Sequence, residues 1–244
     1  MAGRRKFFHK MFPRKWNWFE TILLILGFVV PIVLGIVFES SPLEITTSVL
    51  FITAMLIIAK AHVSGYFIAL IAYILYVFVA WNSGLFGEVI TIGLGTIPIT
   101  VWTIFLWIKR GRKDKSSETV KIESVKWKRL GLLIGSQLIM GIGYFFLLRS
   151  FGTSFLLLST IALAVNIIGD ILCARRCVLG PYAYVLYDIL TIALWSMVFA
   201  SGHTGAIVMI VMSTMNAIND GYGAVNWTKL LAKQGTHTYN CKHE

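Results

Sequence analysis

Long apolar stretches alternate with short polar connections along this chain. Eight of them run for about 20 residues, the length that a helix needs to cross a hydrocarbon core about 30 Å thick. They cover residues 19–38, 43–60, 64–82, 86–108, 130–149, 153–173, 180–200 and 204–228. Because the alternating decamers of membrane barrels are missing, the pattern predicts eight transmembrane α-helices.

Composition supports a membrane fold. Hydrophobic residues make up 57% of the 244 residues and charged residues only 14%, and the mean hydropathy is +0.77. A chain of this kind cannot cover a water-soluble surface with polar groups. The fold class predicted from the sequence is therefore an all-α integral membrane protein with one compact bundle.

Two segments indicate an internal repeat. "AKAHVSGYF" and "ARRCVLGPY" each place a small residue and a base before a glycine, and aligning Gly65 with Gly180 pairs Lys60 with Arg175. The two units begin four spans apart, so they have the same orientation in the membrane. The predicted organisation is a basic arm and extra first span over 1–42, a three-helix repeat over 43–108, a basic loop over 109–129, a linker helix over 130–149, a second three-helix repeat over 153–228 and a tail over 229–244.

Basic residues set the expected orientation. If the eight spans alternate, every one of the 22 Lys and Arg residues except Arg149 falls on one side. Basic residues collect in cytoplasmic loops, so both termini are predicted to be cytoplasmic in a bacterial inner membrane. Attraction to anionic lipid accounts for the net charge of +11, and nucleic acid is not expected because bases and aromatic residues are not interleaved.

The last span carries a polar stripe in its middle, within "NAIND" at 216–220. Asn216, Asn219 and Asp220 follow the i, i+3, i+4 pattern and share one helix face. Asn216 lies about 18 Å from the basic end at Lys229, which places the stripe near mid-bilayer. Polar groups that faced lipid at this depth would be costly, so we expect them to face the bundle interior.

Other spans add polar and aromatic groups at comparable depth. These are Tyr66, Tyr73 and Tyr76 in the third span, Gln137 in the fifth, Asn166 and Asp170 in the sixth, and Tyr184, Asp188, Thr191 and Trp195 in the seventh. Lys and Arg occur only at the edges of the spans, so Asp188 and Asp220 must hold a proton, accept hydrogen bonds or meet a cation. A purely structural role, in which amides and tyrosines join helices by hydrogen bonds, remains the alternative. Glu88 is expected to stabilise the outer helix N-terminus of the fourth span.

Several function classes are not supported. The chain has none of the motifs of metalloproteases, serine hydrolases or phosphate-binding loops, so no enzyme, cofactor or metal is predicted. Nor is there a carbonyl filter or a ring of like charges, as a channel requires. Cys173, Cys177 and Cys241 map to the reducing cytoplasmic side, and we expect no disulfide.

The residues now support a resemblance. "FPRKWNWFE", "AKAHVSGYF", "LFGEVITIGLGTIPITVWTIFLW", "SQLIMGIGYFFLL" and "NAINDGYGAVNW" are similar to the PnuC family of nicotinamide riboside transporters over about residues 12–230. The resemblance implies two parallel three-helix repeats and a linker, as in SWEET transporters, with one extra first span. It also implies facilitated diffusion of nicotinamide riboside, which phosphorylation by a cytoplasmic riboside kinase would trap.

The resemblance also assigns site residues. It implies that Gln137, Asn216 and Asn219 contact the substrate and that Tyr73, Tyr76, Tyr187 and Trp195 stack on its base. Asp188 or Asp220 could complement the positive pyridinium, and Tyr184 and Asn166 complete the predicted set. The chain departs from many relatives at "TIGLGTI", where they are rich in Asn or Tyr before the proline.

Two alternatives stay open at this point. Thiamine or another nucleoside-like vitamin presents similar chemistry, and a vitamin-binding membrane sensor would bind without flux. We expect no ion coupling, because discontinuous helices with Gly and Pro at matching positions are not evident. A homo-oligomer is compatible with the sequence.

Overall fold

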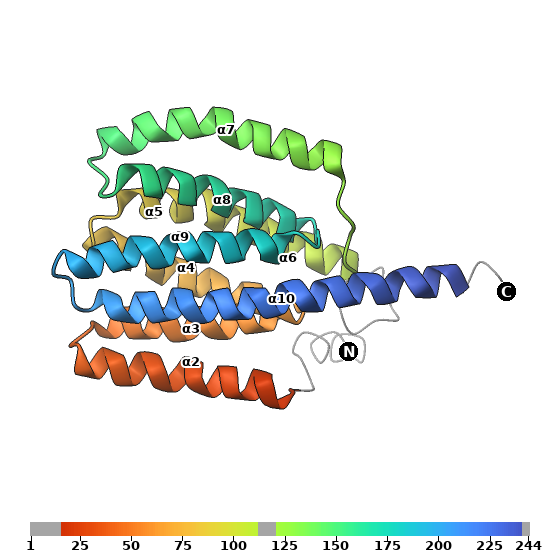
Figure 1. Cartoon of the computed structure of the whole chain (residues 1–244), viewed down its shortest axis with the longest axis horizontal. Coiled ribbons are helices and arrows are strands. Elements are labelled where there is room, and N and C mark those ends of the chain that lie inside the picture. The colour runs from red at the N-terminus through yellow and green to blue at the C-terminus, as the bar shows by residue number, and fades with distance from the viewer. Residues whose placement is uncertain (1–15, 112–120, 241–244) are drawn as a thin grey trace, which may run out of the picture.

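The computed structural model describes residues 16–111 and 121–240, and these form a bundle of helices (Figure 1). The N-terminal arm before residue 16, the middle of the basic loop and Cys241 lie outside the described residues. The helical elements are α2 (Trp18–Val37), α3 (Pro42–Ala59), α4 (Ser64–Asn82), α5 (Phe86–Ile90), the π-helical segment η1 (Thr91–Thr96), α6 (Ile97–Gly111), α7 (Trp127–Ser150), α8 (Leu156–Ala174), α9 (Gly180–Ala200) and α10 (Ala206–Asn240).

The prediction of an all-helical membrane protein is confirmed. Seven segments within the described residues are long and apolar enough to cross a membrane, with α5, η1 and α6 together forming one of them. The first part of α10, which corresponds to the eighth predicted span, is not among these seven, and it carries the polar stripe with Asn216, Asn219 and Asp220. At about 1.5 Å per residue, α10 is longer than the bilayer is thick, and its end projects from the bundle (Figure 1).

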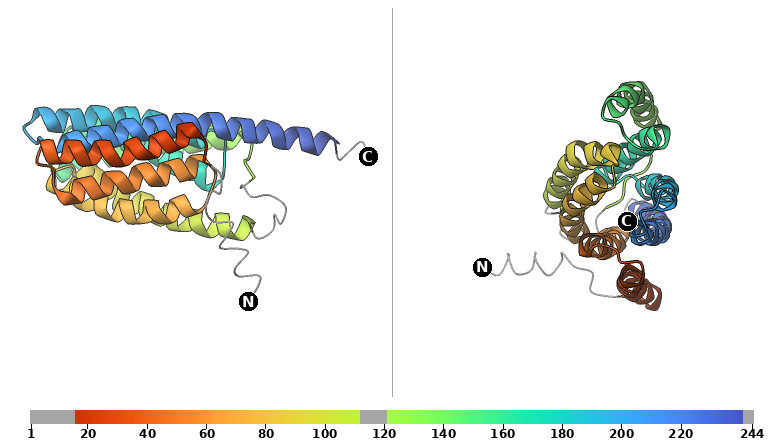
Figure 2. Two further views of the ribbon diagram at one scale, coloured as in Figure 1. Left: turned by 90° about the horizontal axis from the view of Figure 1, so that it is seen from below. Right: turned by 90° about the vertical axis from the view of Figure 1, so that its left-hand side faces the viewer.

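The helices lie side by side with α2 and α7 at opposite edges (Figure 2). The most extensive contacts join α9 to α10, α3 to α4, α10 to α3 and α8 to α9. Thus the last helix of the second predicted repeat packs directly on the first helix of the first. The central part of the bundle is built from both predicted repeats, and α7 packs against α8 at the edge.

The fourth span differs from the continuous α-helix expected over 86–108. Its middle is π-helical over Thr91–Thr96. Pro98 follows directly, and because it has no N–H, it cannot close a regular α-helical hydrogen bond in this turn. Gly95 also lets η1 approach α8, since a Cβ there would lie 2.7 Å from Ile167 Cδ1. The expectation that no span is interrupted is therefore incomplete: this span continues, but with a changed helical pitch.

Corresponding turns support the proposed repeat. Ala61 follows α3 with φ 58° and Arg176 follows α8 with φ 62°, so both turns use one left-handed residue at aligned positions. Each turn is followed by a glycine that packs tightly: a Cβ on Gly65 would meet Ile58, and one on Gly180 would meet Cys173.

A buried ion pair ties the extra first span to the bundle. Lys60 Nζ at the end of α3 lies 2.6 Å from Glu20 Oε2 in α2. Tyr222 of α10 donates its hydroxyl to Glu20 Oε1 at 2.7 Å, and Asn17 completes a capping box with the same carboxylate. Glu20 is only 3% exposed, so the ion pair and these hydrogen bonds must replace the hydration that its carboxylate loses on burial.

We predict that Lys60→Gln lowers the free energy of unfolding by about 2–3 kcal/mol, because it leaves a buried carboxylate without its cation. Thermal unfolding in detergent, followed by tryptophan fluorescence, measures the effect. Lys229→Gln removes an exposed charge at the same end and should change stability little. Adding Glu20→Gln to Lys60→Gln should recover part of the loss; a double variant less stable than Lys60→Gln would contradict this account.

Candidate binding cavity

A small cavity lies between helices of both predicted repeats. Its walls come from α3, α4, η1, α9 and α10. The lining combines four tyrosines and a phenylalanine with two carboxyl groups and one amide. The lining residues are Phe51, Met55, Tyr73, Tyr76, Ile92, Tyr184, Tyr187, Asp188, Thr191, Met212, Ser213, Asn216 and Asp220.

Glu88 of α5 joins three helices next to this cavity. Its Oε2 accepts hydrogen bonds from Tyr76 of α4 at 3.2 Å and from Tyr187 of α9 at 3.0 Å. The indole of Trp195 donates in turn to the Tyr76 hydroxyl at 3.1 Å. Glu88 lies in the first turn of α5, as expected, but it is fully buried and its carboxylate points to the tyrosines. Glu88 thus lies in the first turn of its helix, as the sequence predicts, and its carboxylate in addition joins α5 to α4 and α9.

The aromatic part of the wall is built from perpendicular ring contacts. Phe51 packs edge to face with Tyr73, with ring centroids 4.9 Å apart, and with Tyr76 at 5.7 Å. Tyr76 also packs against Trp195 at 6.0 Å. Such contacts stabilise a pair by about 0.5–1.5 kcal/mol beyond burial. The rings therefore form a connected unit that presents both ring faces and hydroxyls.

The polar part of the wall contains two neighbouring carboxyl groups. Asp188 of α9 and Asp220 of α10 are buried and lie within hydrogen-bonding reach of each other. Asp188 Oδ2 and Asn216 Oδ1 have no hydrogen-bond partner among the described residues. Among the residues that the structure describes, no Lys, Arg or His lines this cavity. Unpaired acceptors on a cavity wall require a donor or a cation to offset their desolvation.

A second polar cluster lies between the cavity and α8. Tyr184 donates its hydroxyl to Asp170 Oδ1 at 2.5 Å. Asn166 Nδ2 donates to Thr96 Oγ1 at 2.8 Å, which connects α8 to the end of η1. These contacts hold the π-helical segment against α8 and position Tyr184 on the cavity wall.

Seven of the eleven predicted site residues line the cavity. They are Tyr73, Tyr76, Tyr184, Tyr187, Asp188, Asn216 and Asp220. Trp195 lies behind Tyr76, and Asn166 belongs to the second polar cluster. Asn219 is fully buried and donates to the Ile52 carbonyl at 3.2 Å, joining α10 to α3.

Gln137 occupies a different place. It is buried on α7, where its Nε2 lies 3.9 Å from Met140 Sδ and its Oε1 has no partner among the described residues. It does not line the cavity. Its substrate contact stays a prediction that would require α7 to lie closer to the cavity than it does here.

Sequence reasoning missed the apolar contributors, which are Phe51, Met55, Ile92 and Met212, together with Ser213. Nothing distinguishes an apolar residue on a cavity wall from one in the core when only spacing is known. Glu88 could have been found, because an ionisable residue inside a span marks a candidate functional site by default.

The chemistry of the cavity suits an organic cation. Ring faces attract a cation by about 0.5–2 kcal/mol, and neighbouring carboxyl groups complement its charge. Within the described residues, no group of three or more His, Cys, Asp or Glu could hold a metal ion. The free volume is about 30 Å³, close to the share of one water molecule in the liquid. The walls must therefore separate before a larger molecule can enter.

Comparison with known proteins identifies related chains. Residues 41–229 match the family model described as "Nicotinamide mononucleotide transporter". The "Nicotinamide riboside transporter PnuC" of Neisseria mucosa is 24% identical over 220 residues, covering 89% of this chain and 84% of the relative. The protein of the same name from Haemophilus influenzae is 25% identical over 233 residues, covering 96% and 98%.

A solved structure has the same fold. "Crystal structure of the Vitamin B3 transporter PnuC" superposes with a TM-score of 0.81 at 23% identity and covers 93% of this chain and 97% of that one. The two chains therefore share one fold.

We predict that Tyr76→Phe lowers the free energy of unfolding by about 1–3 kcal/mol, because it leaves the buried Trp195 indole N–H without an acceptor. The measurement is thermal unfolding in detergent. Tyr182→Phe is the matched control, since Tyr182 is 48% exposed and bonds only the Thr228 hydroxyl at 3.3 Å. Equal losses in the two variants would show that the buried Tyr76 hydroxyl, which contacts Trp195 and Glu88, adds nothing to stability beyond that of an exposed tyrosine hydroxyl.

Proposed function

The chain belongs to the nicotinamide mononucleotide transporter family, and from this membership we propose that it takes up nicotinamide riboside by facilitated diffusion. The family is one of transporters rather than enzymes, and the chain is a multi-pass membrane protein. The observation that carries the proposal is the cavity, whose lining combines four tyrosines with Asp188, Asp220 and Asn216.

Nicotinamide riboside presents groups that match this wall. Its pyridinium ring carries a permanent positive charge, which suits the faces of Tyr73 and Tyr76 and the charge of Asp188 and Asp220. Its carboxamide and ribose hydroxyls can donate to the unpaired Oδ atoms of Asn216 and Asp188. Each polar group of the wall that lacks a partner thus has one on the substrate.

Charge favours the riboside over the mononucleotide. The two differ by a phosphate, which is anionic at neutral pH. The cavity wall holds two carboxyl groups and no basic residue, so a phosphate would be both desolvated and repelled. The relatives that carry the name nicotinamide riboside transporter agree with this choice.

Transport requires the cavity to widen. Ligand sites usually enclose about 300–1,000 Å³, far more than the 30 Å³ present here. The walls come from the two proposed repeats, whose relative movement is the usual basis of alternating access. The π-helical turns of η1 border the cavity through Ile92, and such turns often occur at functional sites.

Orientation and trapping complete the proposal. Lys60 directly follows α3 and Arg175 directly follows α8. These helix ends lie at the end of the bundle where α2 begins and α10 leaves it (Figure 1). The positive-inside tendency supports a cytoplasmic position for this end and for both termini in a bacterial inner membrane. A cytoplasmic riboside kinase would then convert the imported cation to an anion that this cavity disfavours, which maintains net uptake.

Facilitated diffusion is proposed because the substrate itself can balance the carboxyl pair. Asp188 and Asp220 need one positive charge nearby, and the pyridinium supplies it without a coupling ion. The alternative is that a proton leaves the cell for each riboside cation that enters. Facilitated diffusion would move one positive charge per riboside across the membrane, whereas this exchange would move none.

We predict that purified protein binds nicotinamide riboside at least about tenfold more tightly than nicotinamide, the mononucleotide or thiamine, by heat of binding in detergent. Asn216→Ala should weaken riboside binding about tenfold, the loss of one hydrogen bond of about 1–1.5 kcal/mol, while Tyr182→Phe should not change it. Binding of thiamine alone would keep the architecture and overturn the substrate.

We predict that proteoliposomes with an inside-negative potential of about 100 mV accumulate riboside up to about 50-fold, because one positive charge gains about 2.3 kcal/mol across that potential. Radiolabelled uptake without any kinase measures it, and a protonophore added at constant potential should not alter it. Uptake that follows a pH gradient instead would indicate proton exchange. Binding without any uptake would indicate a sensor.

A further inference from the structure

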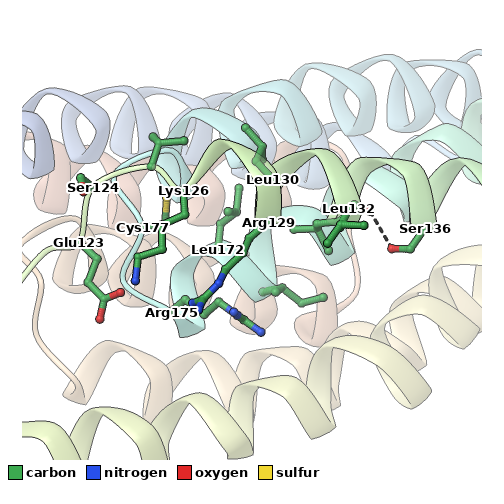
Figure 3. Close-up of a pocket in the computed structure, with 13 residues that line it drawn as sticks. Glu123, Ser124, Lys126, Arg129, Leu130, Leu132, Ser136, Leu172, Arg175 and Cys177 are labelled. Atoms are coloured by element: carbon green, nitrogen blue, oxygen red, sulfur yellow. Dashed lines mark hydrogen bonds between the residues drawn. The ribbon is translucent and has the colours of Figure 1, made fainter.

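A second and much larger cavity lies at the edge of the bundle. It is a groove between the first half of α7 and the last turns of α8, and its volume is about 640 Å³. Figure 3 shows its lining residues, which rise from α7 on one side and from the α8–α9 turn on the other. It shares no lining residue with the central cavity.

The groove exists because α7 is loosely packed. Only 6% of the apolar stretch of α7 is buried. Helix α8 is the one described helix with which α7 makes extensive contact. Glycines do not bring it closer, because a Cβ added to Gly131 or Gly135 would meet no atom within 4 Å. Most of the apolar surface of α7 is therefore available to something other than this chain.

The mouth of the groove, next to Glu123 and Cys177, is held in place by backbone hydrogen bonds. The Glu123 N–H donates to the Arg176 carbonyl at 2.8 Å, and the Val178 N–H donates to the Glu123 carbonyl at 3.1 Å. This short bridge fastens the segment before α7 to the α8–α9 turn. The mouth of the groove is thus a fixed feature of the fold.

Basic side chains surround that end. Lys126, Arg129 and Arg175 are exposed and line the groove, and their nitrogen atoms gather in one region (Figure 3). None of the three forms an ion pair with a described residue. Glu123 is the one carboxylate in the lining, so the groove is net positive.

The wall beyond the basic end is apolar. Leu130 and Leu133 of α7 face Ile171 and Leu172 of α8 along the groove. Both helices cross the hydrocarbon region, so this wall lies at the depth of lipid chains while the basic end lies at the depth of headgroups. A positive mouth above an apolar channel between transmembrane helices is the arrangement that accepts an anionic lipid.

We propose that this groove binds one anionic phospholipid, with its phosphate at Lys126, Arg129 and Arg175 and an acyl chain between α7 and α8. The lipid fills the space that α7 leaves open and neutralises three bases that have no partner among the described residues. It thereby fastens the helix that links the two proposed repeats. The proposal does not depend on the substrate of the central cavity.

Charge argues against a helix of a second copy as the occupant. In an oligomer within one membrane, the copies share one orientation, so only groups at the same depth can meet the basic mouth. The described carboxylates away from the core are Glu39 and Glu44, at the opposite end of the bundle, and Glu123, in the groove itself. A second copy would therefore bring no described acid to the three bases.

The test compares two charge-matched variants in mild detergent. The full chain, Arg129→Gln/Arg175→Gln and the control Lys128→Gln/Lys229→Gln are titrated with dioleoyl phosphatidylglycerol and, separately, with dioleoyl phosphatidylcholine, and bound lipid is counted by native mass spectrometry. Lys128 and Lys229 are exposed at the same membrane end but do not line the groove. We expect phosphatidylglycerol to bind one per chain, and the groove variant to bind it about 10- to 30-fold more weakly than either of the others.

A second variant tests the apolar part without a change in charge. Ser136 is exposed at the far end of the lining, and Ser136→Trp should fill the channel and also weaken phosphatidylglycerol binding, with thermal unfolding confirming that the variant is folded. Equal weakening in the groove and control variants would reduce the effect to general surface charge and overturn the proposal. So would equal binding of phosphatidylcholine, or a dimer or trimer mass that the groove variant loses without any change in bound lipid.

Discussion

The cost of burying a carboxyl group in a membrane interior shapes this bundle. Glu20 meets it with Lys60 and a tyrosine hydroxyl, Glu88 with two tyrosine hydroxyls, and Asp170 with another. The contacts of Glu20 and the Tyr187–Glu88 bond join helices that are distant in the sequence, whereas the Tyr76–Glu88 and Tyr184–Asp170 bonds join successive helices. Glu88 Oε1, Asp170 Oδ2 and Asp188 Oδ2 still have no hydrogen-bond partner among the described residues, and of these three residues Asp188 is the one that lines the central cavity. The paired carboxylate oxygens hold the helices together, and Asp188, whose unpaired oxygen belongs to a cavity-lining residue, is the group that we propose as the partner of a cation.

The sequence predicts the spans well because length and hydropathy determine them directly. Within the fourth span it does not predict the change of pitch, although Pro98 and two glycines mark the region. A π-helical turn depends on what the wider turn packs against, here Ile167 and the amide of Asn166 on α8. Those partners come from another span, and spacing along one helix cannot identify them.

In the candidate site, too, the sequence predicts some features and not others. Helical periodicity correctly places Tyr73, Tyr76, Asp188 and Asn216 on inward faces, because polar groups in lipid have few alternatives. The depth of a residue in the membrane follows from its distance to the ends of its span. Which helices surround its span does not follow from the sequence pattern of that span. Gln137 shows the difference: it is buried, as expected, yet on a helix at the edge of the molecule.

Helix α10 connects stability to the cavity. On one side Asn219 and Asn226 donate to the Ile52 and Ala59 carbonyls of α3, and Tyr222 bonds Glu20 of α2. On the other side Asn216 and Asp220 line the cavity. Helix α3 belongs to the first proposed repeat and α10 to the second. When the proposed repeats move to widen the cavity, either these hydrogen bonds break or α3 and α10 move together as a pair. Each hydrogen bond that breaks during this movement raises its free-energy cost by about 1 kcal/mol. The contacts that stabilise α10 therefore also limit how easily the cavity opens.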